Sequence, residues 1–164
     1  MGSEMCIRDR HWPESMWLDL IDRYLAAGLQ PLVTWGDERE RARAQRLVDA
    51  GATMIERRPI RALMDLLAGC ALVVAVDSGL GHLAAALGVP TIGLYGATSG
   101  ELTGCRGRTA SFMQGETACA PCMRKQCRAY RGPALEWQGQ TIAPPCFASV
   151  TPERVFSASR GWLV

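Results

Sequence analysis

The chain has 164 residues, of which 48% are hydrophobic and 21% charged, and its formal net charge is +2. This length fits one domain with an ordinary core, and the composition excludes a disordered chain and gives no sign of a nucleic-acid partner. The longest strongly apolar run, residues 71–76, is far shorter than the roughly 20 residues of a membrane span, so we expect a soluble, cytoplasmic protein.

The first ten residues, MGSEMCIRDR, follow neither a helical nor a strand period. They are interpreted as a scar of expression or of sequence assembly and are left out of the fold prediction. On this interpretation the natural protein extends upstream of His11, and we expect the chain to be a fragment.

From Pro13 onward, stretches with helical spacing alternate with short apolar runs, and proline or glycine marks most boundaries. Helices are expected at residues 13–28, 37–49, 59–69 and 80–87, and strands at 31–36, 53–56, 72–76 and 91–96. Each crossover helix must return over the sheet before the next parallel strand. This order therefore predicts an α/β fold with a doubly wound parallel sheet.

After about Gly100 the pattern decays into sequence rich in glycine, proline and cysteine. Regular structure is expected again only at Thr151-Pro152-Glu153, which reads as a helix cap and first turn. We expect residues 11–107 to form the main α/β unit. Residues 108–164 are expected to form an irregular, Cys-rich extension whose C-terminal helix completes the domain.

The most informative segment is the junction where the strand at 72–76 runs through Asp77-Ser78-Gly79 directly into a helix. This geometry leaves the first amides of the helix without partners at the positive end of its dipole, where a phosphate binds readily. Ser78 adds a hydroxyl donor, and Gly79 and Gly81 are expected to remove side chains that would hold a ligand away from the backbone. His82 is expected to reach the same anion.

Two other interpretations of this segment remain open. In the first, Asp77 is only a helix cap and His82 only a surface residue. In the second, the pattern Gly79-x-Gly81-x-x-Ala84 marks an NAD-binding dehydrogenase fragment. The second is weakened because the next strand ends without the acidic residue that would hold a ribose.

Residues 73–98, VVAVDSGLGHLAAALGVPTIGLYGAT, resemble the C-terminal domain of the ADP-heptose:lipopolysaccharide heptosyltransferases, type I above all. The resemblance extends to residues 11–13, 35–36 with Glu38 and Glu40, and 68–72, and it covers most of the chain to about Gly107. It implies a Rossmann-like nucleotide-sugar-binding domain, one half of a GT-B architecture. The whole enzyme is expected to transfer heptose from ADP-heptose to the Kdo-lipid A acceptor with inversion, in the lipopolysaccharide inner core.

The resemblance also implies roles for single residues. Ser78 and Gly79 should bind the donor pyrophosphate, with Asp77 ordering the turn and His82 close by. The ribose or adenosine side of ADP-heptose should meet either Glu38 or Glu40, two alternatives that the resemblance leaves open. The backbone around Arg58 to Ile60 should lie against adenine.

Two departures from the family limit this assignment. The phosphate-binding lysine that precedes the Trp-Pro pair falls at Arg10, inside the suspected scar. The acceptor site and the catalytic carboxylate belong to the N-terminal domain, so no residue of this chain is expected to be the catalytic base. The family has no metal requirement, and we expect no cofactor for catalysis.

Four cysteines in the irregular region, Cys119, Cys122, Cys127 and Cys146, have a spacing that could form a structural zinc site. Reduced thiols without metal and a disulfide are the alternatives. If zinc were bound and nucleotide were not, the chain would instead be a non-catalytic interaction module.

A mild excess of basic residues near this cluster could face the anionic inner-membrane surface or a phosphorylated lipid acceptor. A solvated basic loop is the simpler interpretation. The residues concerned are Arg124, Lys125, Arg128 and Arg131.

Overall fold

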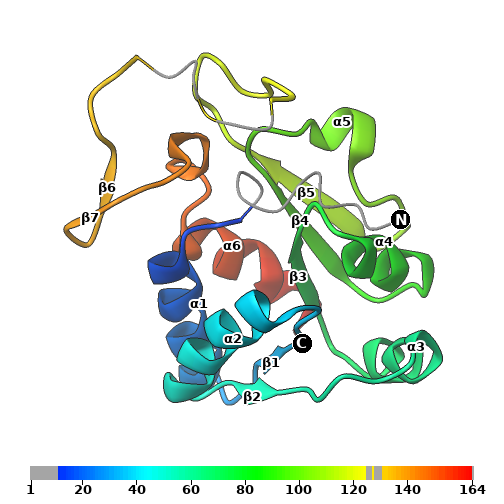
Figure 1. Cartoon of the computed structure of the whole chain (residues 1–164). Coiled ribbons are helices and arrows are strands. Elements are labelled where there is room, and N and C mark those ends of the chain that lie inside the picture. Colours follow the sequence, from blue (N-terminus) through cyan, green and yellow to red (C-terminus); the bar gives the residue numbers. More distant parts are fainter. Residues whose placement is uncertain (1–10, 125–126, 128–130, 164) are drawn as a thin grey trace.

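The structure is a computed structural model that describes residues 11–124, 127 and 131–163 (Figure 1). Residues 1–10, where we expect a scar, lie outside the described residues, and so do Arg10, Lys125 and Arg128. None of the described helices is long and apolar enough to cross a membrane.

The first two thirds of the described chain alternate helix and strand in the order expected from the sequence. The elements are α1 (Glu14–Ala26), β1 (Leu32–Val33), α2 (Glu38–Asp49), β2 (Thr53–Met54), α3 (Ile60–Ala68), β3 (Val73–Val76), α4 (Gly79–Ala86) and β4 (Thr91–Tyr95). Gly28, with a φ of +77°, follows α1 and confirms the predicted stop. The strands β1 and β2 are shorter than predicted, at two residues each.

The remainder of the chain is more regular than the sequence indicates. It contains α5 (Gly100–Thr103), β5 (Ala110–Gln114), β6 (Glu136–Trp137), β7 (Gln140–Thr141), a 3-10 turn at Pro145–Phe147, α6 (Pro152–Ser159) and a 3-10 turn at Arg160–Trp162. The expectation that regular structure stops after Gly100 is therefore wrong. β5 lies beyond residue 107 and is a full strand of the main sheet. Its sequence, ASFMQ, has no clear period, so only pairing with β4 reveals it.

The main sheet has the order β3-β4-β5, and all its strands are parallel, as are β1 and β2 in a separate pair. Every residue of the central strand β4 is buried. Ile92 and Leu94 of β4 pack in a core with α1 and α6, whereas Val73 of β3 packs in a second cluster with Ala84 of α4 and Leu67 of α3. Helices thus cover both faces of the sheet (Figure 1), which confirms the doubly wound α/β prediction.

The C-terminal segment closes the core by packing α6 beside α1 (Figure 1). The indole N–H of Trp12, a residue only 2% exposed, donates to the carbonyl of Val150 at 2.8 Å, across 138 positions of sequence. Trp12 also packs edge-on against Trp17, with ring centroids 4.9 Å apart. This buried bond fixes the start of α1 to the segment that precedes α6.

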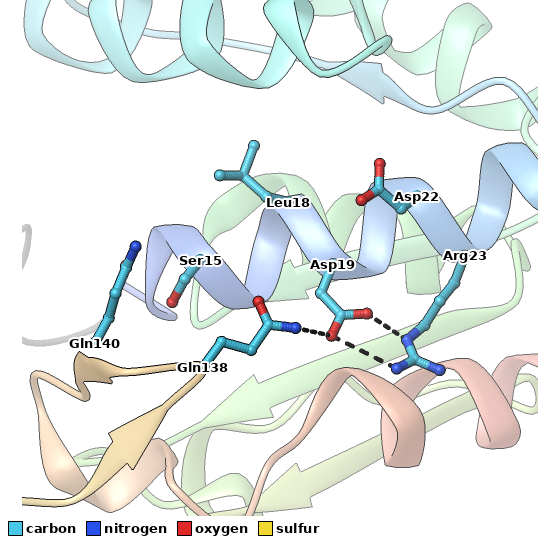
Figure 2. A pocket seen from close by; sticks show the side chains of 7 residues that line it. All are labelled: Ser15, Leu18, Asp19, Asp22, Arg23, Gln138 and Gln140. Atoms are coloured by element: carbon cyan, nitrogen blue, oxygen red, sulfur yellow. Dashed lines mark hydrogen bonds and ion pairs between the residues drawn. The ribbon is translucent and has the colours of Figure 1, made fainter.

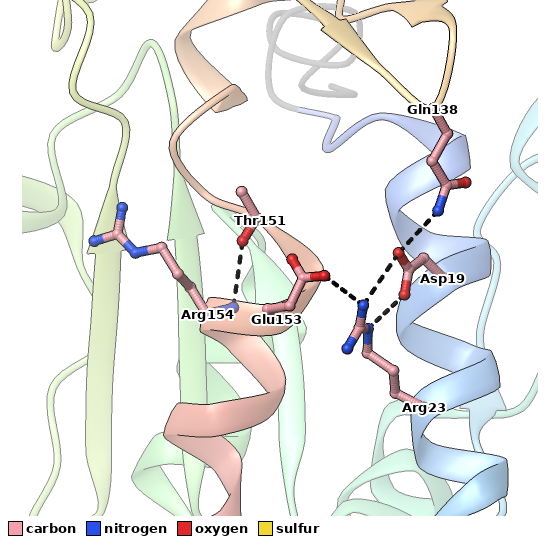
Figure 3. A network of polar contacts seen from close by, with 6 residues as sticks. All are labelled: Asp19, Arg23, Gln138, Thr151, Glu153 and Arg154. Atoms are coloured by element: carbon pink, nitrogen blue, oxygen red, sulfur yellow. Dashed lines mark hydrogen bonds and ion pairs between the residues drawn. The ribbon is translucent and has the colours of Figure 1, made fainter.

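A polar network joins the same helices at the surface (Figure 3). Arg23 of α1 bonds Asp19 one turn earlier at 2.5 Å and Glu153 of α6 at 2.6 Å. Gln138, in the turn between β6 and β7, donates to Asp19 at 3.2 Å. Because Arg23 and Glu153 are partly exposed, each such ion pair contributes at most about 1 kcal/mol, and the network aligns α1, α6 and the hairpin more than it stabilises them.

Replacing Trp12 with phenylalanine should destabilise the protein by about 1–3 kcal/mol, because the buried carbonyl of Val150 loses its donor. The matched control is Trp137→Phe: the Trp137 indole nitrogen is buried and has no hydrogen-bond partner in the described residues, so its removal should cost far less. Urea denaturation followed by circular dichroism measures both. Equal losses in the two variants would show that the Trp12 bond contributes nothing specific.

Candidate functional site

The strand-to-helix junction after β3 has the geometry of an anion site. Ser78 is the N-cap of α4, in extended conformation, and its Oγ accepts from the Gly81 amide at 3.4 Å. The His82 amide donates to the Ser78 carbonyl at 3.3 Å. Within the described chain the amides of Gly79 and Leu80 have no hydrogen-bond partner, so two donors stand free at the positive end of the helix dipole.

The cap of this helix is Ser78, so the interpretation of Asp77 as a simple N-cap is wrong. The Asp77 side chain is only 8% exposed, with Oδ1 3.8 Å from Nε2 of His82. The His82 side chain is 45% exposed and begins on the first turn of α4. The structure thus brings Asp77, Ser78, Gly79 and His82 together on one turn, with the histidine open to solvent.

The two glycines of the turn have different functions. A Cβ built on Gly79 meets nothing within 4 Å, so this exposed position is open toward solvent, as expected for approach of a ligand. A Cβ on Gly81 would lie 3.0 Å from Cβ of Ala75 on β3 and 3.3 Å from Sγ of Cys105. The expectation that Gly81 admits a ligand is therefore wrong: this buried glycine lets α4 pack closely on β3.

A buried pair of side chains beneath the turn is not evident from the sequence, where Cys105 stands alone. The hydroxyl of Tyr95, at the end of β4, accepts from the Cys105 amide at 3.1 Å and lies 3.6 Å from its sulfur. Burial above all, and then the thiol of Cys105, raise the pKa of Tyr95, so this phenol stays neutral. Cys105 of this pair packs against α4, with its sulfur 3.3 Å from the place of a Cβ on Gly81.

Glu38 and Glu40 lie at the start of α2, at the carboxyl end of β1. Asp37 caps α2 by accepting from the Glu40 amide at 2.8 Å, while Oε2 of Glu40 accepts from the Gly36 amide at 2.6 Å. The Glu40 carboxylate is thus used to order its own loop. Glu38 is 80% exposed, and Arg41 at 3.6 Å is its one ion-pair partner among the described residues.

Arg58 and Ile60 lie after β2, and both are exposed; the Ile60 side chain is the first of α3. The contacts of Trp35 in this region are not evident from the sequence. The guanidinium groups of Arg41 and Arg57 lie 5.4 and 5.8 Å from the Trp35 ring centroid. These loops follow the separate β1–β2 pair, whereas the α4 turn follows β3 of the main sheet.

A cavity of about 320 Å³ lies elsewhere, between α1 and the β6–β7 hairpin (Figure 2). Its lining is polar, and it shares Asp19 and Arg23 with the surface network. The lining residues are Ser15, Leu18, Asp19, Asp22, Arg23, Gln138 and Gln140. Because none of the residues expected to bind a ligand lines it, we do not assign this cavity to the candidate site.

The four clustered cysteines are all free. Cys146 is buried, Cys119 and Cys122 are half-buried, and Cys127 is exposed. As placed, no three metal-binding side chains in the described chain are close enough together to hold an ion. The predicted zinc site is thus not preformed and stays a prediction.

Comparison with known proteins gives a family match and several relatives. The model of glycosyltransferase family 9 (heptosyltransferase) matches residues 2–131. Lipopolysaccharide heptosyltransferase 1 of Pseudomonas aeruginosa is 39% identical over 152 residues, which are 89% of this chain and 42% of the relative. The chain spans less than half the length of the curated relatives it matches.

Solved structures give a consistent result. The structure described as E. coli heptosyltransferase WaaC with ADP has a TM-score of 0.62 and 36% identity, over 63% of this chain and 33% of that one. E. coli ADP-heptose lps heptosyltransferase II has a TM-score of 0.72 over 99% of this chain and 44% of that one. At 21% identity, the second likeness shows the fold alone. Neither the dehydrogenase nor the interaction module finds support among these relatives.

The different surroundings of Gly79 and Gly81 predict different effects of alanine substitution on the stability of the protein. Gly81→Ala should destabilise the protein by about 1–2 kcal/mol, because the added methyl overpacks the contact between α4 and β3. Gly79→Ala should leave stability unchanged or raise it by up to about 1 kcal/mol, since the position is open and alanine favours the helix. Thermal unfolding measures both, and a stable Gly81→Ala variant would contradict the packing assigned here.

Proposed function

This chain belongs to glycosyltransferase family 9, and we propose that it is the donor-binding half of an enzyme that transfers heptose from ADP-heptose to the lipopolysaccharide inner core. The observation that carries the proposal is the turn of α4, where the free amides of Gly79 and Leu80 face outward beside His82. A relative with 36% identity has been solved with ADP, a ligand whose pyrophosphate suits this turn.

In the proposed reaction a hydroxyl of the acceptor sugar attacks the anomeric carbon of the donor and displaces ADP with inversion. Negative charge grows on the leaving pyrophosphate as the glycosidic bond breaks. The amides of Gly79 and Leu80 and the dipole of α4 are fixed in advance to stabilise that charge. These groups and the His82 imidazole carry the proposed stabilisation, and no metal cofactor is invoked.

The Ser78 hydroxyl serves two partners in this proposal. It accepts from the Gly81 amide, and its own proton is free to donate to a phosphate oxygen. The Asp77 carboxylate is mostly buried and lies 3.8 Å from the His82 imidazole. We assign Asp77 the role of orienting this imidazole.

The ribose is assigned to Glu38 in preference to Glu40. The Glu40 carboxylate already accepts from the Gly36 amide, whereas Glu38 is largely exposed, and its one ion pair with a described residue is a long contact to Arg41. The backbone from Arg58 to Ile60 is assigned to adenine, because this segment follows β2 at the carboxyl edge where parallel sheets bind nucleotides.

The catalytic base and the acceptor site are proposed to lie in an N-terminal domain, consistent with the share of its relatives that the chain spans. The proposed acceptor is lipid-linked, Kdo-lipid A in the family, which places the reaction at the cytoplasmic face of the inner membrane. Arg124 and Arg131 are exposed and suited to a peripheral contact with that anionic surface.

Calorimetric titration of the chain with ADP, ADP-heptose and NAD tests the proposal. ADP and ADP-heptose should bind and NAD should bind more weakly. Ser78→Ala and His82→Ala should each raise Kd by about 2- to 12-fold, the cost of one lost hydrogen bond. Ser78→Thr keeps the hydroxyl and should retain affinity, and Gln45→Ala, on the exposed face of α2, should change nothing.

Equal affinity for NAD and ADP-heptose would overturn the assignment of the donor. Unchanged affinity in both Ser78→Ala and His82→Ala would remove the pyrophosphate from the α4 turn. Absence of nucleotide binding by a chain with the expected helical signal would contradict an autonomous donor site.

A further inference from the structure

Two stretches of the C-terminal region that carry cysteines, at Cys122 and at Cys146, contact the segment that follows β4. Cys146 is buried in the 3-10 turn after β7, and its Sγ lies 2.8 Å from the place of a Cβ on Gly96. The Met123 amide donates to the carbonyl of Ala97 at 2.8 Å. This bond brings Cys122, the preceding residue, to the same segment after β4.

Backbone and side-chain contacts order the segment that carries Cys119 and Cys122. The Ala120 amide donates to the Thr117 carbonyl, closing a turn at Cys119, and the Thr117 hydroxyl lies 3.7 Å from the Cys119 sulfur. Met123, with a φ of +53°, reverses the chain directly after Cys122. Cys119 and Cys122 therefore lie in one tight segment of chain, with the Cys-x-x-Cys spacing that is common among zinc-binding segments.

Cys146 has no evident role in donor binding. Its thiol is buried and packs on Gly96, which follows β4, whereas the α4 turn follows β3. The Cys-x-x-Cys turn is bonded to Ala97, the residue after Gly96, so the two cysteine-bearing stretches meet at one place in the fold.

We propose that Cys119, Cys122, Cys127 and Cys146 bind one structural Zn²⁺ ion, which fastens residues 117–124 and the Cys146 turn to the carboxyl end of β4. Since no three of these thiols are yet close enough together to hold an ion, binding must turn the side chains toward one another. Each thiol releases its proton to solvent as its bond to zinc forms. The resulting site carries a charge of −2, and the exposed Arg124 follows Cys122 by two residues in the sequence.

The pairing of β3 with β4 indicates a structural role for the proposed zinc site. Val76, the last residue of β3, pairs with Leu94 of β4, and Ser78 and Gly96 each follow two residues later in the chain. The proposed zinc would therefore hold the segment that flanks the donor turn. It would also join β4 to a C-terminal region that otherwise contributes little regular structure there.

Metal analysis of the purified 164-residue chain tests the proposal without any measurement of transferase activity. About one zinc per chain is expected by mass spectrometry of the metal. Replacement by Co²⁺ should give the intense d–d absorption of a tetrahedral site and a thiolate-to-cobalt band. Cys122→Ser and Cys146→Ser should lose at least three quarters of the bound metal.

The matched control is Cys70→Ser, because the Cys70 thiol lies at the end of α3, where its Sγ donates to the Leu66 carbonyl, outside the cluster. This variant should keep its zinc and its cobalt spectrum. Absence of metal and of tetrahedral cobalt absorption in the wild-type chain overturns the proposal, whatever the variants do. So does a disulfide between any two of the four cysteines after purification under reducing conditions, or equal metal loss in Cys70→Ser. If the chain retained zinc but bound no nucleotide, the result would contradict the proposed transferase function and leave the zinc proposal intact.

Discussion

The close approach of α4 to β3 is the constraint on which the candidate site depends. Gly81 rests on Ala75 and on Cys105, and no larger residue fits there without displacing one of them. Because the helix packs so tightly, its first turn is held just beyond the end of the strand. Within the described chain, two amides without partners, the Ser78 hydroxyl and the exposed His82 imidazole thus lie on one turn, and a Cβ on Gly79 would meet nothing within 4 Å.

The rest of the fold supports this edge from the other side of the sheet. β4 is buried along its whole length between β3 and β5, and its even-numbered residues pack on α1 and α6. The buried bond from Trp12 to Val150 joins the first helix to the last, so the C-terminal segment is part of the core that carries the site.

Three structural features meet at the carboxyl end of β4. Gln114 of β5 donates to the Tyr95 and Gly96 carbonyls and accepts from the Gly100 amide, so it orders the chain as it leaves the strand. The Tyr95 hydroxyl accepts from the amide of Cys105, whose sulfur packs against Gly81 of α4. Cys146 packs on Gly96 from the C-terminal region. The proposed donor turn follows β3 and the proposed zinc site follows β4, so the two lie at the ends of neighbouring strands.

The sequence by itself determined the alternation of helices and strands as far as β4, the covering of both sheet faces by helices, and the turn from Asp77 to His82. These features depend on local periodicity and on the residues that start and end helices. Tertiary structure alone decided the rest. β5 has no period of its own and becomes a strand only by pairing with β4. Gly79 and Gly81 look alike in sequence, yet one faces solvent and the other faces Ala75, because only the packing of α4 on β3 separates them. Glu38 and Glu40 were likewise equivalent until the loop before α2 placed the Gly36 amide against one of them.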